Sequence, residues 1–180
     1  PGGLAARLAG VPLVIHEQNA VPGLTNRLLS RFAQEALEGF EGALIGGVWV
    51  GNPVRAEITG LPAPAERYEQ RRGPLRVLVL GGSQGALALN QDLPELLMAA
   101  LGSHLEVRHQ CGAGREEEAA PVYKALGLDA RVSEFIDDMA EAYAWADLVV
   151  CRAGALTVAE VAAAGVAVDA VFDSVSVATT

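Results

Sequence analysis

The feature that most constrains the fold is a short apolar run that ends at once in glycines, LRVLVLGGSQGA at residues 75–86. A compact run of branched apolar residues is typical of a strand that is covered on both faces of a parallel sheet. From Gln84 onward the sequence becomes helical, so Gly81, Gly82 and Ser83 are predicted to lie at a strand-to-helix turn. The stretch therefore indicates an α/β protein.

This turn is a candidate anion site. Glycines without a Cβ atom let the backbone approach a ligand closely, and the first N–H groups of a helix favour a phosphate. Ser83 adds a hydroxyl donor. The alternative is ordinary turn chemistry, because a glycine pair after a strand is common and the residues fit neither a dinucleotide fingerprint nor a P-loop.

The rest of the second half repeats the same order of elements. The pattern predicts strands at 76–80, 105–110, 132–135 and 148–151, each followed by a helix, at 85–101, 116–126, 139–146 and 156–164. Four such units predict a parallel sheet covered by helices. A shorter α/β pattern precedes them, and residues 61–73 are charged, contain prolines and have no apolar face. We therefore predict a first domain over 1–60, a linker over 61–73 and a second domain over 74–180.

Composition excludes several classes of protein. The chain of 180 residues has a formal net charge of −9, which argues against nucleic acid as a partner. No apolar stretch is long enough to cross a membrane. Cys111 and Cys151 lack the spacing of a metal or redox motif, and there is no D-x-D sequence, so we expect no metal and no cofactor.

Polar residues follow several predicted strands, where ligands of open α/β sheets bind. Glu17 and Asn19 come directly after the strand at 11–15, and they either belong to a site or cap the next helix. Arg55 follows a turn and either faces an anion or lies on the surface. Asp137 and Asp138 are expected at a helix start rather than on a metal. Glu160, one helical turn beyond Thr157, is expected to lean toward the sheet edge, where it either accepts hydrogen bonds from sugar hydroxyls or is solvated.

Long stretches of the chain resemble one enzyme family, the MurG family of N-acetylglucosaminyltransferases, which complete the lipid-linked disaccharide of peptidoglycan. The resemblance runs in register over about residues 1–165. It is carried by HEQNAVPGLTNRLLSRFA at 16–33, GNPVR at 51–55, LGGSQGALALN at 80–90, EFIDDMAEAYAWADLVVCRAGALTVAE at 134–160 and AAAG at 162–165.

The resemblance implies a glycosyltransferase B fold of two Rossmann-like parallel-sheet domains, both incomplete in this chain. It implies an inverting transfer of N-acetylglucosamine from UDP-N-acetylglucosamine to lipid I without a cofactor, in the cytoplasm on the inner face of the bacterial cell membrane. Asn19 and Arg55 would act from the N-terminal side of the cleft, and Ser83 with Gly81 and Gly82 would meet the diphosphate. The remaining implied contacts are Ile136 for uracil, Ala155, Leu156 and Thr157 for the sugar-phosphate region with Val158 and Ala159 in the same segment, and Glu160 for the ribose.

The sequence also departs from the family pattern at both ends. The family's first glycine-rich loop, whose histidine is a catalytic candidate, would precede Pro1, so the catalytic residue stays unknown here. After Gly165 the chain reads VAVDAVFDSVSVATT, which shows no family counterpart. We therefore expect an internal piece of a transferase that lacks transfer activity by itself. Three hypotheses stay open: an enzyme that transfers N-acetylglucosamine, a fragment that binds UDP-sugar without turnover, and a truncation product that folds poorly.

Overall fold

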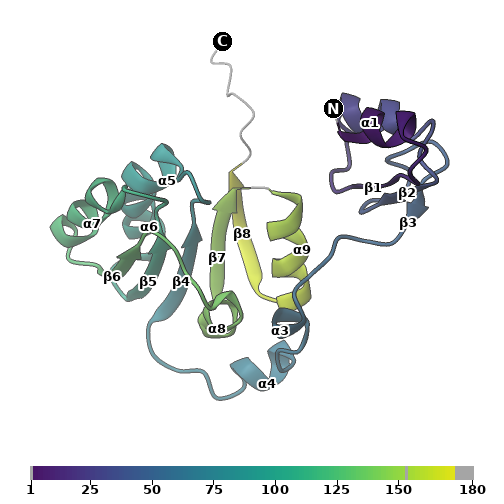
Figure 1. The fold of residues 1–180 in the computed structure, drawn as a ribbon. Coiled ribbons are helices and arrows are strands. Elements are labelled where there is room, and N and C mark those ends of the chain that lie inside the picture. Colours follow the sequence, from purple (N-terminus) through teal and green to yellow (C-terminus); the bar gives the residue numbers. More distant parts are fainter. Residues whose placement is uncertain (1, 153, 173–180) are drawn as a thin grey trace, which may run out of the picture. The chain divides into compact units, whose positions relative to one another are not determined.

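The computed structural model describes residues 2–152 and 154–172, which form two compact units. Unit 1 extends to Pro53, and unit 2 begins at Val54 (Figure 1). Unit 1 holds a parallel sheet in the order β1-β2-β3, accompanied by two helices. Its elements are α1 (Gly2–Leu8), β1 (Val14–Glu17), α2 (Leu24–Leu29), β2 (Glu35–Glu38) and β3 (Val48–Trp49).

Unit 2 is built on a five-stranded parallel sheet in the order β6-β5-β4-β7-β8. This confirms the predicted parallel α/β architecture. The strands are β4 (Leu75–Leu80), β5 (Leu105–Gln110), β6 (Asp129–Ser133), β7 (Leu148–Arg152) and β8 (Ala167–Phe172). Strand β8 pairs in parallel with β7, so the α/β pattern continues after Gly165; residues 173–180 of that tail lie outside the described part.

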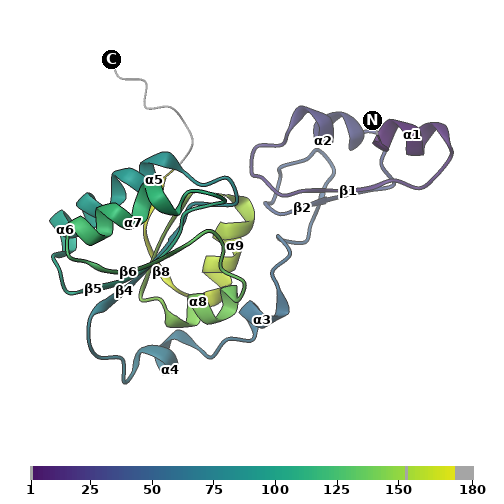
Figure 2. The same cartoon turned by 60° about the vertical axis from the view of Figure 1, so that its left-hand side comes forward.

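Helices cover both faces of this sheet (Figure 2). Successive side chains of a strand point to opposite faces, so Val77 and Val79 pack with one set of helices while Leu78 and Leu80 pack with the other. One face carries α5 (Leu87–Gln91), α6 (Leu93–Leu101) and α7 (Glu116–Ala125), and the other carries α3 (Ala56–Thr59), α8 (Met139–Trp145) and α9 (Ala155–Ala164). The strand is thus buried on both sides, as its unbroken apolar run requires.

The predicted helix over 85–101 is wrong at its start and in its middle. Gly85 has a φ of +70°, which an α-helix does not accept, so the first helix begins only at Leu87. Pro94 lacks the N–H that a helix interior needs, and it lies instead in the first turn of a second helix, α6. A loop over 81–86 therefore separates β4 from α5.

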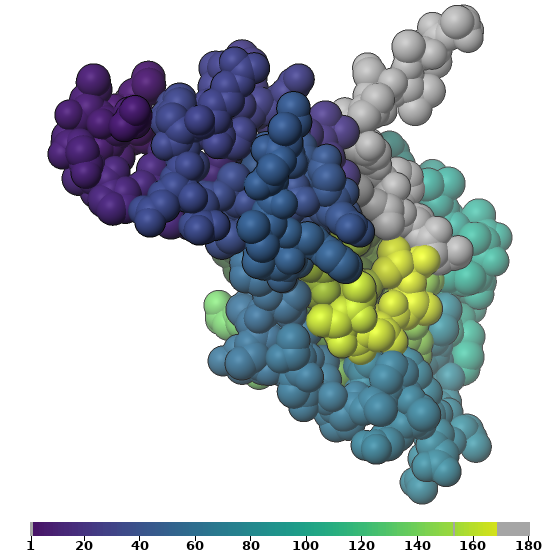
Figure 3. Space-filling model, turned by 90° about the vertical axis from the view of Figure 1, so that its right-hand side faces the viewer, coloured from purple at the N-terminus to yellow at the C-terminus, as the bar shows by residue number. Residues whose placement is uncertain are grey.

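The stretch predicted as a linker, 61–73, belongs to unit 2 in the structure and contains a short helix, α4 (Pro64–Tyr68). Its cationic and phenolic side chains satisfy carbonyl groups at the ends of two helices, which have no partner within the helix itself. Arg67 donates to the carbonyl groups of Tyr143 and Ala164, and the Tyr68 hydroxyl donates to the carbonyl of Ala146 at 3.0 Å. Alongside α4, the preceding helix α3 packs against α9, whose surface is yellow in Figure 3 beside the blue of this segment.

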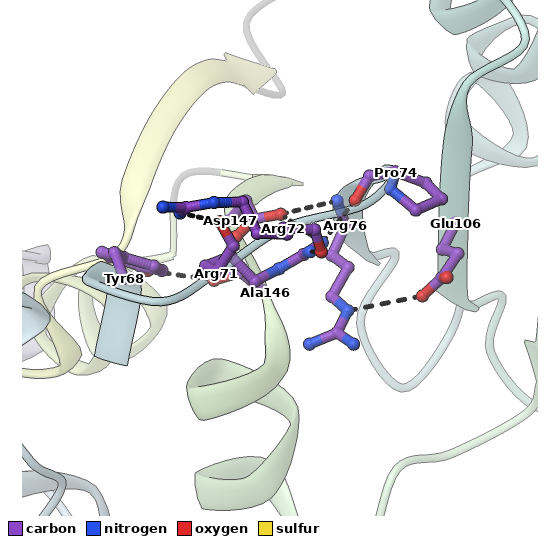
Figure 4. A network of polar contacts seen from close by, with 8 residues as sticks. All are labelled: Tyr68, Arg71, Arg72, Pro74, Arg76, Glu106, Ala146 and Asp147. Atoms are coloured by element: carbon purple, nitrogen blue, oxygen red, sulfur yellow. Dashed lines mark hydrogen bonds and ion pairs between the residues drawn. The ribbon is translucent and has the colours of Figure 1, made fainter. Parts of the chain in front are cut away.

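A carboxylate completes this attachment (Figure 4). Oδ2 of Asp147 accepts hydrogen bonds from the Arg71 guanidinium and from the backbone N–H of Arg76, both at 2.9 Å. Arg76 also pairs with Glu106 on the neighbouring strand at 3.3 Å. Arg67 and Arg71 therefore fasten this stretch to the helix ends and to Asp147, whereas Arg72 is exposed and bonds within its own segment.

Acid is expected to destabilise unit 2 through His109, which is fully buried in β5 beside the Tyr123 hydroxyl. Burial lowers the pKa of His109 from 6.5 to about 4. The unfolded chain takes up this proton near its ordinary pKa, so the stability contributed by neutral His109 is complete above about pH 6.5 and is lost as the pH falls toward about 4, at about 1.4 kcal/mol per pH unit. Urea unfolding at about pH 7.5 and about pH 5 measures this loss. His109→Gln should make the free energy of unfolding less dependent on pH, whereas His104→Gln, at an exposed position, should leave the pH dependence unchanged. An equal change of the free energy of unfolding with pH in both variants would contradict the assignment to His109.

Candidate functional site

A pocket of about 520 Å³ lies where the strand order of unit 2 reverses, at the carboxyl ends of β4 and β7. Strands continue from β4 toward β5 on one side and toward β7 on the other, and ligands of open α/β sheets bind in the crevice at such a switch point. The pocket is lined by Arg55, Leu80, Gly81, Gly82, Gln110, Met139, Tyr143, Arg152, Gly154, Thr157 and Glu160. Five residues singled out from the sequence therefore meet here: Arg55, Gly81, Gly82, Thr157 and Glu160.

The glycine turn forms one wall of the pocket. A Cβ atom on Gly81 would lie 2.9 Å from the carbonyl oxygen of Gln110, so the backbone of neighbouring turns approaches too closely for a side chain there. Gly82 has a φ of +80°, and a Cβ atom on it would meet nothing within 4 Å, so its backbone borders open space. Ser83 is exposed and lies four positions before α5, which corrects the expectation that it stands at a helix start.

The opposite wall is the beginning of α9. Gly154 is its N-cap residue, and among the predicted binding residues of this helix Thr157 and Glu160 line the pocket. Residues three apart share a helix face, because each residue turns the helix by about 100°. Ala155, Leu156, Val158 and Ala159 are not among the described lining residues, and Leu156 and Val158 are exposed.

Glu160 is held from two sides. Its Oε1 atom accepts from the Arg55 guanidinium, with Nε at 3.1 Å and Nη2 at 3.0 Å, and its Oε2 atom accepts from the Tyr143 hydroxyl at 3.2 Å. Burial, reinforced by the Glu160 carboxylate, raises the pKa of Tyr143 well above its ordinary value. Tyr143 therefore keeps its proton and remains a donor to Glu160.

Arg55 reaches this site from within unit 2. It is the N-cap residue of α3, and its contact with Glu160 joins residues far apart in the chain. The sequence predicts that it acts from the first domain, whereas its side chain donates to Glu160 on α9. Half of the Arg55 side chain is exposed, at 51%, so the guanidinium remains accessible to an anionic ligand while it pairs with Glu160.

Ile136 is not among the residues that line this pocket. It lines a separate hollow together with Phe135, Asp137 and Asp138. Asp138 is the N-cap residue of α8 and accepts a hydrogen bond from the Glu141 N–H at 2.8 Å, which confirms its predicted place at a helix start.

Asn19 lies in unit 1, where it bonds to the carboxylate of Glu17. Both the backbone N–H and the side-chain amide of Asn19 donate to Oε1 of Glu17, at 2.9 and 3.1 Å, while Oε2 accepts from Gly23 and Asn26. Burial alone would raise the pKa of Glu17, but these four hydrogen bonds outweigh it and lower the pKa. Glu17 thus anchors the turn that follows β1.

Six lining residues were given no site role from the sequence: Leu80, Gln110, Met139, Tyr143, Arg152 and Gly154. Gln110 and Arg152 end β5 and β7, so the rule that ligands lie at the carboxyl ends of parallel strands was the signal available for them. Met139 and Tyr143 lie on α8, and the sequence offers no comparable signal for their direction.

Comparison with known proteins identifies the family. Residues 76–171 match the Glycosyltransferase family 28 C-terminal domain, and residues 1–38 match the Glycosyltransferase family 28 N-terminal domain. The chain belongs to glycosyltransferase family 28. This match confirms the resemblance drawn from the sequence. Because it extends to position 171 in β8, the expectation that the residues directly after Gly165 have no family counterpart was wrong.

Two relatives of the chain share the name UDP-N-acetylglucosamine–N-acetylmuramyl-(pentapeptide) pyrophosphoryl-undecaprenol N-acetylglucosamine transferase. The protein of Alcanivorax borkumensis is 75% identical over 93% of this chain, and that of Xanthomonas axonopodis pv. citri is 63% identical over 92%. The crystal structure of MurG from Acinetobacter baumannii matches 98% of the chain with a TM-score of 0.77 and 45% identity. The chain spans 47%, 39% and 50% of these three proteins, respectively, which is half of their length or less.

Within the described residues, no helix is both long enough and apolar enough to cross a membrane.

Proposed function

We propose that this glycosyltransferase family 28 chain binds UDP-N-acetylglucosamine in the pocket of unit 2 and serves the transfer of N-acetylglucosamine to lipid I, which yields lipid II. The observation that carries the proposal is the convergence of Arg55, Gly82, Thr157 and Glu160 at the switch point of the sheet. The name of the relatives, which describes this transferase, supports the proposal. The place of action that we propose is the cytoplasmic, inner face of the cell membrane, with the protein bound peripherally.

The roles that we propose follow from the chemistry of each group. The Glu160 carboxylate accepts hydrogen bonds from the ribose hydroxyls, because Arg55 and Tyr143 already fix its orientation. The turn with Gly82 and Ser83 receives the diphosphate, and Thr157 faces the phosphates from α9. Negative charge develops on the departing UDP during transfer, and the Arg55 guanidinium together with backbone N–H groups stabilises it. The uracil edge is read by backbone groups near Ile136.

Calorimetric titration of the chain with UDP and with ADP tests the binding site. A pyrimidine edge needs paired donors and acceptors in fixed geometry, which a strand end supplies, so UDP is expected to bind more tightly than ADP. Equal affinities for the two nucleotides would contradict the uracil assignment, and no binding of UDP would contradict the site.

A transfer assay, together with the calorimetric titration, distinguishes the three hypotheses that the sequence left open. Radiolabelled UDP-N-acetylglucosamine is incubated with a lipid I analogue and with the 180-residue chain. We expect this chain to bind UDP but to transfer no N-acetylglucosamine, because it spans half of the length of its relatives or less. Transfer at a rate near that of the Alcanivorax borkumensis protein would show that the chain itself is the complete catalyst.

Tyr143→Phe is expected to weaken UDP binding about 3- to 10-fold, because it removes one neutral hydrogen bond that orients Glu160. Tyr123→Phe is the matched control, since Tyr123 is also buried but bonds to His109 outside the pocket lining. Calorimetry should show a weaker Kd for UDP in the first variant only. A Kd unchanged by Tyr143→Phe would contradict the orienting role of this hydroxyl.

A further inference from the structure

The carboxamide of Gln110 holds Gly82 by both of its backbone polar groups. Its Oε1 atom accepts from the Gly82 N–H at 3.1 Å, and its Nε2 atom donates to the Gly82 carbonyl at 3.0 Å. Nε2 also donates its second hydrogen to the Glu134 carbonyl, at 3.0 Å. A reversed amide would place oxygen against two carbonyl oxygens, so these partners fix its orientation.

These bonds join three turns at the carboxyl edge of the sheet. Gly82 follows β4, Gln110 is the last residue of β5, and Glu134 follows β6. Two further bonds run between the same turns, from the Ala113 N–H to the Ser83 carbonyl at 3.3 Å and from the Gly114 N–H to Glu134 at 2.8 Å. Gln110 is the buried centre of this set, with 8% of its surface exposed.

The hydrogen bonds also decide which groups of the turn remain for a ligand. The N–H groups of Gly81 and Gly82 are already used, by the carbonyl and the side chain of Gln110 respectively. Within the part of the chain that the structure describes, no hydrogen bond uses the Ser83 N–H or the Ser83 hydroxyl. Gly82 itself has the freest backbone of any residue type, so its conformation depends on what holds it.

We propose that Gln110 is a positioning residue for the diphosphate. By holding Gly82, which lines the pocket, it fixes the backbone direction of the next residue, Ser83, which lies outside the described lining and would supply its N–H and hydroxyl to the diphosphate. The proposal rests on the proposed function, because it takes the ligand of the pocket to be UDP. It assigns the phosphate donors to Ser83 and removes the Gly82 N–H from that role.

Two substitutions test the proposal in the full 180-residue chain. Gln110→Met keeps the length of the side chain and removes its three hydrogen bonds, and Gln91→Met makes the same change at an exposed residue of α5. Calorimetry is expected to show UDP binding weakened about tenfold or more by Gln110→Met, with uridine binding changed less than threefold. Gln91→Met should change neither. Equal losses for UDP and uridine, or no loss for UDP, would overturn the proposal.

A double-mutant cycle separates positioning from general loosening. Ser83→Ala should weaken UDP binding about tenfold or more in the wild-type chain and less than twofold in Gln110→Met, because the hydroxyl is no longer aimed at the phosphate. Additive effects would overturn the proposal. If Gln110→Met does not fold, Gln110→Glu replaces it, since the carboxylate still accepts from Gly82 but no longer donates to the two carbonyl groups. UDP affinity equal to wild type in that variant would likewise overturn the proposal.

Hydrogen exchange keeps this test independent of the ligand. The Gly82 amide should exchange at least tenfold faster in Gln110→Met than in Gln91→Met, because its acceptor is lost. If the wild-type chain binds no UDP, the proposed function fails, and the exchange rate still reports whether Gln110 holds the turn. Unchanged exchange at Gly82 would overturn that part of the proposal.

Discussion

Gly112→Ala is expected to lower the free energy of unfolding of the chain by about 3–5 kcal/mol, the combined cost of a strained backbone and an overpacked contact. Gly112 has a φ of +91°, and a Cβ atom on it would lie 2.3 Å from the backbone nitrogen of Gly85. Neither atom is at the end of a flexible side chain, so the backbone of one turn must move. Urea unfolding measures the loss.

Gly114→Ala is the matched control for this effect. Gly114 lies in the same turn and also has a positive φ, of +68°, but a Cβ atom there would meet nothing within 4 Å. Only the backbone strain remains, which costs about 1–2 kcal/mol. If both variants lose the same stability, the close approach of the two turns after β4 and β5 does not exist in solution.

The sheet of unit 2 was predictable because its residues carry redundant signals. The run at 75–80 is too short and too apolar for a surface helix, and it ends in glycines that terminate the strand. Burial on both faces then follows from the side-chain alternation of Val77 and Leu78. The helical spacing from Thr157 to Glu160, in turn, placed Glu160 on the face of α9 that leans toward the sheet edge, where the pocket lies.

The contacts of the charged residues could not be predicted from the local sequence pattern. A stretch with several arginines and prolines has the composition of a linker, yet Arg67 and Arg71 bind carbonyl and carboxylate groups of distant elements. Helix ends leave carbonyl groups without partners, but the sequence does not say which distant cation will satisfy them. The Arg55 to Glu160 contact has the same origin, since it depends on where α3 packs.

The start of α5 shows a conflict between propensity and backbone geometry. The residues after Ser83 favour a helix, but the close approach of neighbouring turns requires Gly85 in a left-handed conformation. A Cβ atom on Gly85 would lie 2.3 Å from the Cys111 carbonyl. Tertiary packing therefore moves the start of the helix to Leu87. A single sequence does not reveal that the backbone of a distant turn, at Cys111, comes this close to Gly85.

Gly82→Val is expected to weaken UDP binding more than about 100-fold, which corresponds to about 2.7 kcal/mol or more. In the structure a Cβ atom on Gly82 meets nothing within 4 Å, so a side chain there projects into open space beside the pocket. If the diphosphate occupies that space, the branched side chain excludes it. The positive φ of +80° also costs stability, about 1–3 kcal/mol, so binding must be expressed per folded molecule.

Gly127→Val separates exclusion from strain. Gly127 follows α7, has a φ of +67°, and likewise has nothing within 4 Å of an added Cβ atom, but it is not among the residues that line the pocket. Its variant should lose a similar amount of stability and keep the wild-type Kd for UDP. Ser83→Ala gives an intermediate result, because it removes one hydroxyl donor and blocks nothing, with an expected loss of about 1.5–3 kcal/mol of binding free energy. If Gly82→Val and Gly127→Val bind UDP equally well once unfolded molecules are discounted, the glycine turn does not receive the diphosphate, and the anion site that the sequence first suggested must lie elsewhere on the chain.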